Sequence, residues 1–510
     1  MSNLSLILNG FLIALAPTNL FAAISGAFMG LIVGAMPGIG SLAGVALLLP
    51  LTFKMNPTTA IIMLAALYYS NMYGGSFSAI LLNIPGDSPA VMTSLDGYPL
   101  SRSGKAGKAL FTSVISSFIG GTVGVILLSL MGPVLSSVGV KFGPAELASL
   151  NLLALTSIGW LLGEKPLKGL QMTCLGILLA LVGVDATLGQ PRFTFGNINL
   201  LSGISFIPLV IGAFGFSQVL DLMSNRIDVS EIANKKLTLK ESLLNKNEIK
   251  KVIPIAFRCG FLGNFIGILP GAGATSAAFL GYIFQKKMSK EPEMLGKGSI
   301  EGVAAAESSN NGAAMGSFAP LLTLGIPGSG TSAVLLGGLM MWGLRPGPLL
   351  FTENPDFVWG LIGSMYVGNI ICLIIAIACI PFLINILKVP TSIMIPLIST
   401  VCLVGTYSVN NNMFDVYFMI VIGFISYIFR LTGYSVAPLL LAFVLTPGLE
   451  SAVRRAYDIG GGSARIFIEK PISLALIILT IGFSLAPTIT KLARRIKQKN
   501  KNIEEEINPI

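Results

Sequence analysis

The chain has 510 residues, of which 53% are hydrophobic and 11% are charged, and its mean hydropathy is +0.80. This composition is typical of a helical protein that crosses a membrane several times, and it excludes a soluble multidomain protein. The formal net charge of +10 does not indicate nucleic acid, because the basic residues lie mostly in short loops and in the C-terminal tail without interleaved aromatic residues. They are better explained as topology signals.

The sequence contains no histidine and five cysteines. Without histidine, HExxH-type zinc chemistry, Ser-His-Asp catalysis and histidine proton relays are excluded. The cysteines lie in apolar stretches and form no CxxC pair, so they are predicted to be small buried hydrophobic residues. No cofactor is expected, apart from Na⁺ as one possible coupling ion.

Two pairs of similar motifs occur in the same order along the chain. GLIVGAMPGIG at 30–40 matches GNFIGILPGAG at 263–273, and LLNIPGDSPAVMT at 81–93 matches TLGIPGSGTSAVL at 323–335. Such agreement at matched positions indicates an internal repeat.

Charge placement predicts how the two halves are oriented. The stretches 225–251 and 286–297 are rich in lysine, so both are expected to be cytoplasmic. Only the apolar stretch 252–284 separates them, which predicts a re-entrant hairpin that enters and leaves from one side. Its counterpart at 20–51 is flanked by Lys54 alone and is expected to enter from the opposite face. The sequence therefore predicts an all-α polytopic membrane protein with about 10–12 transmembrane segments in two inverted repeats.

The predicted organisation has five parts: a first membrane repeat (1–222), a basic cytoplasmic loop (223–251), a second membrane repeat (252–450), a connecting segment with the last transmembrane helix (451–490), and a charged C-terminal tail (491–510). The sequence does not place residues 1–18 or 431–470 relative to the membrane. In the second of these regions, four cations would face outward against the positive-inside rule: Arg454, Arg455, Arg465 and Lys470.

Helix breakers inside the apolar segments point to a binding site. They free backbone N–H and C=O groups at membrane depth, where such groups are tolerated only if they line a cavity or contact a polar ligand. The predicted structural breaks are Pro37, Gly38, Pro85, Pro270 and Pro327. A half-helix that begins after such a break can bind an anion through its free N–H groups.

We therefore predict a substrate site for an organic carboxylate. Its predicted residues are Asn83, Gly86, Ser88, Gly271, Thr275, Gly328, Ser329, Thr331 and Ser332. Asp87 and Asp96 either belong to this region or are solvated at the membrane face. Tyr68, Tyr69 and Tyr73 are assigned to packing or to anchoring at the membrane interface.

The stretch 301–347 is apolar overall but carries Glu301, Glu307, Asn310 and Asn311. An ionisable residue within a span costs at least ~2.5 kcal/mol on insertion scales, so it is a functional candidate. The asparagine amides can supply oxygen to a cation or N–H to a carboxylate. We predict that these four residues hold the coupling ion, with the alternative that Glu301 lies in the headgroup region beside Lys297.

Several long motifs resemble the large membrane subunit of the tripartite tricarboxylate transporters. They are the GxxPGxG pair, YGGSFSAILLNIPG, TSLDGYPLSRSGKAGKAL, GSIEGVAAAESSNNGAA and LTLGIPGSGTSAVLLGGL, and the resemblance covers nearly the whole chain. It implies a multi-pass protein of the bacterial inner membrane that imports citrate or a related carboxylate by cation-coupled secondary transport. It also implies a small membrane subunit and a periplasmic binding protein as partners. Departures from the family pattern occur at Met36, Ser70, Asn71, Pro89 and Ala306.

Other functions remain as alternatives. A carboxylate-permeable channel, or a structural subunit of a membrane complex, would share the composition, although a passive scaffold would not need two matched sets of broken helices. An enzyme is not expected, because no facing nucleophile and base are evident. The sequence leaves open the particular acid, the choice between H⁺ and Na⁺, and the oligomeric state.

Overall fold

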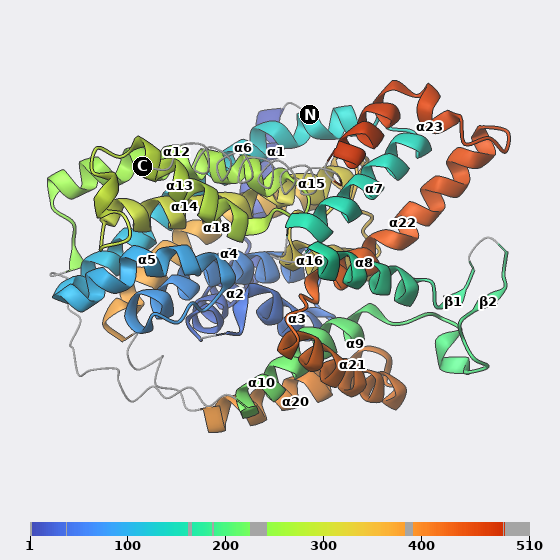
Figure 1. Ribbon diagram of the computed structural model, residues 1–510, viewed down its shortest axis with the longest axis horizontal. Helices are drawn as coiled ribbons and strands as arrows, with labels where there is room; N and C mark the ends of the chain where they lie inside the picture. The colour runs from blue at the N-terminus through green and yellow to red at the C-terminus, as the bar shows by residue number, and fades with distance from the viewer. Residues whose placement is uncertain are drawn as a thin grey trace, which may run out of the picture.

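The computed structural model describes residues 3–36, 38–161, 166–185, 188–224, 242–382, 391–482 and 484. These residues are almost entirely helical (Figure 1), and the strands among them, β1 (Gly183–Val184) and β2 (Pro191–Arg192), form one antiparallel pair. Eight helical segments of this part are long and apolar enough to cross a membrane, and five shorter apolar helices accompany them. The predicted all-α polytopic class is confirmed.

The first interrupted unit comprises α2 (Pro17–Ala35), α3 (Gly40–Thr52), α4 (Pro57–Leu82), the 3₁₀ turn η1 (Ser88–Ala90) and α5 (Val91–Leu100). Between α2 and α3, Gly38 and Gly40 have φ angles of +85° and +66°, which favour glycine. The α4 helix ends at Asn83, whose φ of +58° is left-handed, and the Ile-Pro-Gly sequence that follows cannot continue a helix.

The second interrupted unit comprises α12 (Lys246–Ile268), α13 (Gly273–Met288), η5 (Pro292–Met294), α14 (Ile300–Gly316), α15 (Phe318–Leu324) and α16 (Gly330–Met341). Gly271 and Gly273 repeat the left-handed glycine pair, with φ angles of +76° and +62°. Ser329 begins α16 with a capping box, in which its hydroxyl accepts from the backbone N–H of Ser332. Both units thus contain a helix pair with a glycine turn. A helix that ends shortly before a Pro-Gly break follows in each, α4 in the first unit and α15, which succeeds α14, in the second.

Close backbone contacts of the same kind occur in both units. A Cβ atom on Gly34 of α2 would lie 3.0 Å from the carbonyl carbon of Asn71 in α4, and one on Gly267 of α12 would lie 2.8 Å from the carbonyl carbon of Ala313 in α14. Only glycine permits the two backbones to approach so closely. The two halves therefore share a packing unit, while their opposite orientation in the membrane stays a prediction.

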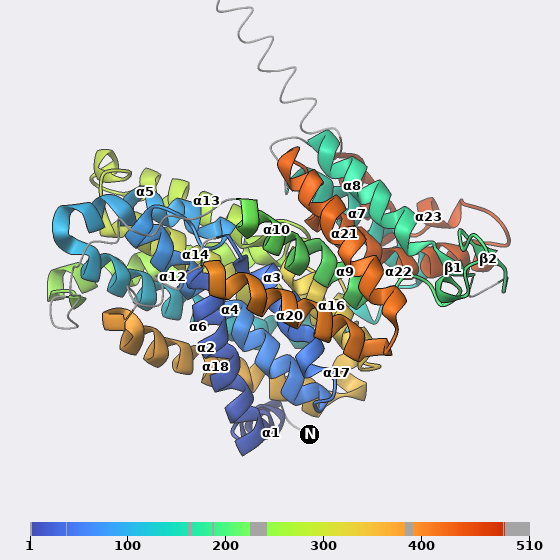
Figure 2. The same ribbon diagram turned by 90° about the horizontal axis from the view of Figure 1, so that it is seen from below.

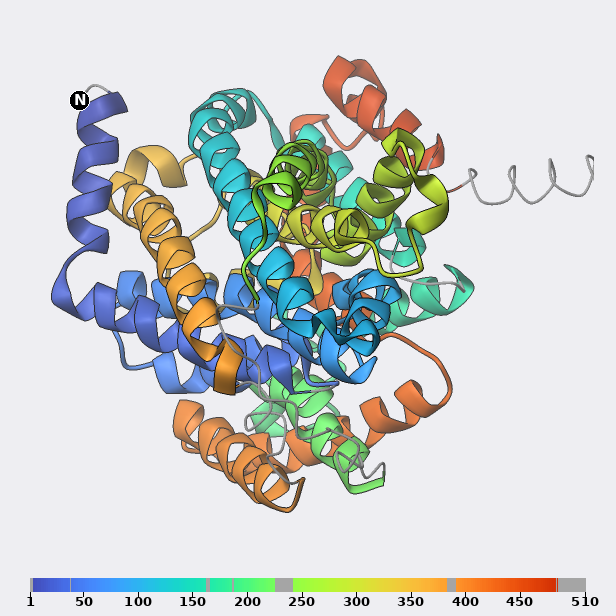
Figure 3. The same cartoon turned by 90° about the vertical axis from the view of Figure 1, so that its left-hand side faces the viewer.

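One long helix of each half packs on the other half. The α6 helix (Ala106–Gly139), which follows η2 (Ser101–Lys105), packs against α12 and α14, whereas α18 (Pro355–Cys379) packs against α2 and α4. Figure 3 shows the orange α18 beside the dark blue α1 (Asn3–Ala14), which it also contacts. The two repeats are interlocked and do not form separate bodies.

Two further groups of helices pack around the two interrupted units with α6 and α18 (Figure 1 and Figure 2). In one, α7 (Pro144–Leu161) and α8 (Pro166–Ala180) pack against α22 (Ala437–Ile459), with α23 (Ile466–Glu469) nearby. In the other, α9 (Phe206–Val210), the π-helical η4 (Ile211–Phe216) and α10 (Ser217–Ser224) pack against α20 (Thr391–Asn410) and α21 (Met413–Leu431). Three short turns, η3 (Ile198–Leu200), α17 (Leu350–Glu353) and η6 (Ile380–Phe382), and the shorter apolar helix Pro471–Gly482 complete the described helices.

The β1–β2 pair lies at the opposite end of the long axis from α5, which leads into the basic η2 turn (Figure 1). An ion network fixes the pair to α22. Arg454 lies 2.6 Å from Asp185 and 2.7 Å from Glu450, and Arg192 lies 2.8 Å from Glu450. Arg454, one of the four cations that conflicted with the positive-inside rule, is therefore neutralised by carboxylates.

Candidate functional site

A cavity of about 660 Å³ lies where the helix breaks meet. Its wall includes residues from the first glycine turn (38–43), the first Pro-Gly break (85–91), the second glycine turn (272–276) and the start of α16 (329–331). Residues of α4, η4, α10 and α21 and of the segment 434–437, which leads into α22, complete the wall. Segments from both halves of the chain thus contribute to one site.

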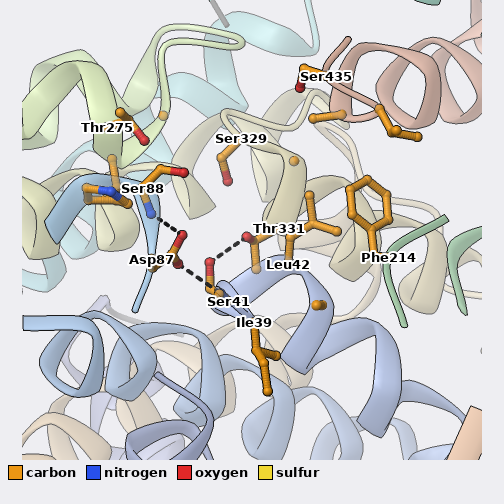
Figure 4. A pocket seen from close by; sticks show the side chains of 18 of the residues that line it. Ile39, Ser41, Leu42, Asp87, Ser88, Phe214, Thr275, Ser329, Thr331 and Ser435 are labelled. Carbon is orange, nitrogen blue, oxygen red and sulfur yellow. Dashed lines mark hydrogen bonds between the residues drawn. The ribbon is translucent and has the colours of Figure 1, made fainter. Parts of the chain in front are cut away.

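Asp87 organises the first-half side of the cavity. Its Oδ2 accepts from the backbone N–H of Ser41 at 2.8 Å, and its Oδ1 accepts from the backbone N–H of Ser88 at 2.7 Å (Figure 4). A Cβ atom on Gly40 would lie 3.1 Å from the same carboxylate. Asp87 therefore belongs to the cavity wall, and its carboxylate accepts the hydrogen bond of the Ser41 backbone N–H at the start of α3.

Hydroxyl groups connect the two halves across the cavity. The Oγ atoms of Ser41 and Thr331 lie 2.9 Å apart (Figure 4), and the hydroxyl of Tyr68 lies 3.0 Å from Oγ of Ser329. Tyr68 is buried and lines the cavity, so it belongs to the cavity wall as well as to the packed core. These hydroxyls can donate hydrogen bonds to an oxyanion in place of the hydrogen bonds that they now make to one another.

The structure brings five of the nine predicted substrate residues to the cavity wall: Gly86, Ser88, Thr275, Ser329 and Thr331. The other four lie outside the wall. Asn83 is the exposed C-cap of α4, and Ser332 is fully buried in the capping box. Gly271 precedes the wall residue Ala272, and Gly328 packs beside Ser317, whose Cβ would lie 3.0 Å from an added Cβ.

The predicted breaks also differ in their surroundings. Gly38 and Pro85 line the cavity. The carbonyl of Pro270 accepts from the Ser157 hydroxyl at 3.1 Å, and Pro327 is buried. Pro37 lies outside the described residues.

Two wall residues, Arg430 and Ser41, were not among the predicted site residues. Arg430, at the end of α21, is the one cationic side chain on the described wall, and its side chain is 42% exposed. It donates to Oε1 of Gln218 at 2.6 Å and lies 3.5 Å from Asp221. In the sequence Arg430 is indistinguishable from an ordinary topology signal at the end of a span. Ser41 could have been found by extending the motif alignment by one residue past Gly40.

Glu307 lies in a second polar region within the helices. Its side chain is fully buried on α14, and its Oε1 accepts from the Thr93 hydroxyl, while its Oε2 accepts from the Ser117 hydroxyl at 3.0 Å. Among the described residues, no Lys or Arg forms an ion pair with it. A buried carboxylate without a counter-charge is costly, so this position favours binding of a cation or a proton.

Asn310 and Asn311 are buried next to Glu307. The Asn311 amide donates to the Asn310 side-chain oxygen at 2.6 Å and to the Glu307 backbone carbonyl at 3.0 Å. The Nδ2 atom of Asn310 and the Oδ1 atom of Asn311 have no hydrogen-bond partner in the described structure. These two atoms are available to a bound ion or water.

Glu301 is separate from this group. It lies in the first turn of α14, and its carboxylate accepts from the Gln285 amide at 2.7 Å and from the Ser289 hydroxyl at 2.8 Å. The structure therefore divides the four predicted coupling residues into a buried set of three and a peripheral Glu301. None of the four lines the cavity.

Asp96 is fully buried, so it is not a solvated residue at the membrane face. Its Oδ1 accepts from the backbone N–H groups of Gly296, Gly298 and Ser299 at 2.7–2.9 Å, and its Oδ2 accepts from the Tyr282 hydroxyl at 2.7 Å. This carboxylate fixes the middle of α5 to the loop that begins α14.

Comparisons with known proteins agree with the motif resemblance. A family model described as "Tripartite tricarboxylate transporter TctA family" matches residues 20–441. An Agrobacterium vitis protein described as "Uncharacterized 52.8 kDa protein in TAR-I ttuC' 3'region" is 40% identical over 502 residues, which cover 98% of each chain. A second protein of that organism, "Uncharacterized protein in TAR-II ttuC' 3'region", is 41% identical over 241 residues, which cover 47% of this chain and 98% of the relative. No solved structure matches the chain.

Proposed function

The chain belongs to the tripartite tricarboxylate transporter TctA family, and from this premise we propose that it carries a citrate-like di- or tricarboxylate across the bacterial inner membrane. The family is one of transporters whose members work together with other subunits, and the long apolar helices make this chain a multi-pass membrane protein. The proposal concerns the substrate, the coupling ion and the partners of this chain.

The observation that supports a carboxylate substrate is the convergence of the helix breaks on one cavity. Ser88, Thr275, Ser329 and Thr331 present hydroxyls there, and α13 and α16 begin beside it. Helix N-termini and hydroxyls favour anions without requiring a buried cation. Arg430 adds a guanidinium group that matches carboxylate geometry. A volume of about 660 Å³ is of the size that holds small organic ligands.

We place cation coupling at the buried set of Glu307, Asn310 and Asn311. The absence of a counter-charge near Glu307 in the described structure favours a transported H⁺ or Na⁺ at this position, because the ion would remove the cost of the buried charge. Glu301 already has two hydrogen-bond donors at the start of α14 and is proposed to have a supporting role.

The proposed partners are a small membrane subunit and a periplasmic binding protein that delivers the acid. The end of the molecule that carries β1, β2 and α23 lies opposite the basic η2 turn, so it would face the periplasm if the positive-inside rule holds (Figure 1). A delivered acid would then reach the cavity from that side.

Uptake of labelled citrate, succinate and malate by cells that express the chain tests the proposal, with and without a co-expressed binding protein. Saturable uptake that depends on Na⁺ or on a proton gradient is the expected result. Uptake of only cations or sugars would contradict the carboxylate assignment. Non-saturable conductance would instead indicate the carboxylate-permeable channel.

A further inference from the structure

The short helix α5 connects the cavity with the buried carboxylate. Residues 85–89 line the cavity, and so does Val91, the first residue of α5. Two residues later, Thr93 is fully buried and its hydroxyl donates to Glu307. No residue of α14 lines the described cavity wall. One contact between the two polar regions therefore passes through α5.

A second contact fixes the other part of α5 independently of Glu307. Asp96 lies three residues after Thr93, on the same face of the helix. Its Oδ1 accepts from backbone N–H groups of the loop before α14, and its Oδ2 accepts from the hydroxyl of Tyr282 in α13. These partners are separate from the Thr93 and Ser117 hydroxyls that bond the Glu307 carboxylate.

The charge on Glu307 controls the Thr93 contact. A hydrogen bond to an ionised carboxylate is roughly twice as strong as one between neutral groups. Neutralisation of Glu307 would weaken its bonds to Thr93 of α5 and to Ser117 of α6, while Asp96 holds the rest of α5 in place. Tyr73 of α4 is a further titratable group close to Glu307, but its hydroxyl donates to Asn369 at 2.7 Å. The cavity end of α5 is then the part that is freed to move.

We propose that Thr93 is a positioning residue that couples cation occupancy at Glu307 to the shape of the substrate cavity. The inference rests on the proposed function, because it assumes that Glu307 receives the coupling cation. If cation binding changes the affinity for the substrate through residues 85–91, thermodynamic linkage requires that substrate binding changes the cation affinity by the same factor.

The test measures the accessibility of the cavity wall to a labelling reagent, and it requires no carboxylate substrate. Ser88 is exposed on the cavity wall, and a Ser88→Cys reporter in a Cys174→Ser background removes the exposed native thiol. The full-length protein in native membranes is labelled with a maleimide, with Na⁺ replaced by choline or with the pH changed. With Thr93 present, we expect one of the two cations to change the labelling rate about fivefold or more.

Variants at Thr93 then distinguish the effect of its hydroxyl group from the effect of its side-chain volume. Thr93→Val and Thr93→Ala should remove the cation response, whereas Thr93→Ser should retain it. Ser94→Ala is the matched control, because the Ser94 hydroxyl donates to Val91 of the same helix at 2.8 Å, and it should leave the response unchanged. A full response in Thr93→Val or Thr93→Ala would overturn the inference. So would the absence of any cation response with Thr93 present.

Citrate uptake by the same Thr93 variants, with Ser88 and Cys174 left unchanged, distinguishes this failure from failure of the proposed function. If uptake remains cation-dependent while the labelling rate does not respond, the coupling uses another route and the proposed function stands. If uptake is independent of both cations with Thr93 present, the proposed coupling at Glu307 is wrong as well.

Discussion

Glu307 has an unusual environment for a membrane helix, because its carboxylate is fully buried and accepts from the hydroxyls of Thr93 and Ser117, with no ion pair in the described structure. Glu307→Gln keeps the shape of the side chain but cannot bind a cation by charge. We expect coupled uptake to fall at least about 100-fold, in line with removal of a charged group from a buried network. Transport of labelled citrate in membrane vesicles measures this.

The amount of Glu307→Gln protein in the membrane must match that of the unchanged chain. Glu353→Gln is a suitable control, because Glu353 is exposed in the short α17 turn. Unchanged coupled uptake in Glu307→Gln would refute the role of this carboxylate.

Substitution of Arg430, the cationic side chain on the described cavity wall, tests the proposed anion site. Its guanidinium group lies on the cavity wall and is held by Gln218. Arg430→Gln should raise the KM for citrate roughly tenfold, since a hydrogen bond to a charged group is involved and its partial exposure weakens the effect. The maximal rate should change less. Arg455→Gln provides the comparison, because Arg455 is bonded only to Ser451 of its own helix in the described structure. A KM unaffected by Arg430→Gln would remove Arg430 from the proposed site.

At the scale of helices, the glycine contacts hold each interrupted unit together. Gly34→Ala and Gly267→Ala each insert a methyl group against a backbone carbonyl of the neighbouring long helix. Such overpacking typically costs about 1–3 kcal/mol, so both variants should lower the thermal stability of the protein in detergent. Gly448→Ala of α22 has nothing within 4 Å of the added Cβ and should be neutral or slightly stabilising.

Equal melting temperatures for all three glycine variants would show that the close approach does not matter. A decrease in only one of Gly34→Ala and Gly267→Ala would show that the two units are not equivalent in stability. The shared geometry of the α2–α4 and α12–α14 contacts predicts similar decreases.

For the whole molecule, the exchange of α6 and α18 between the halves has a measurable consequence. Each helix covers a pair of helices from the other half, so neither half can bury its interface alone. Residues 1–224 and 242–510, expressed as separate chains, should each give little stable protein, whereas co-expression should allow an affinity tag on one to purify both. A division inside α6, after Thr122, should abolish this assembly. Stable isolated halves would show that the repeats fold independently.

The local sequence was sufficient to predict the membrane class, the family and the positions of most helix breaks. Hydropathy, Pro-Gly pairs and lysine-rich loops act over a few residues, and the same chemistry holds in any fold. The glycine turns at Gly38 and Gly271 and the break at Pro85 therefore occur where the motifs predicted them. Pairing of the motifs also selected Ser88, Thr275, Ser329 and Thr331, which meet at the cavity.

Only the tertiary structure decided which side chains reach the cavity and which do not. Ser332 faces its own cap and Asn83 ends a helix, while Arg430 arrives from a span more than 300 residues away from Asp87 in the chain. Glu307 and Glu301 share a helix but have different partners. Side chains of α5 and α6 donate to Glu307, whereas a side chain near the end of α13 donates to Glu301. These assignments depend on packing between distant helices and on the exchange of α6 and α18, and no local pattern of residues specifies such contacts.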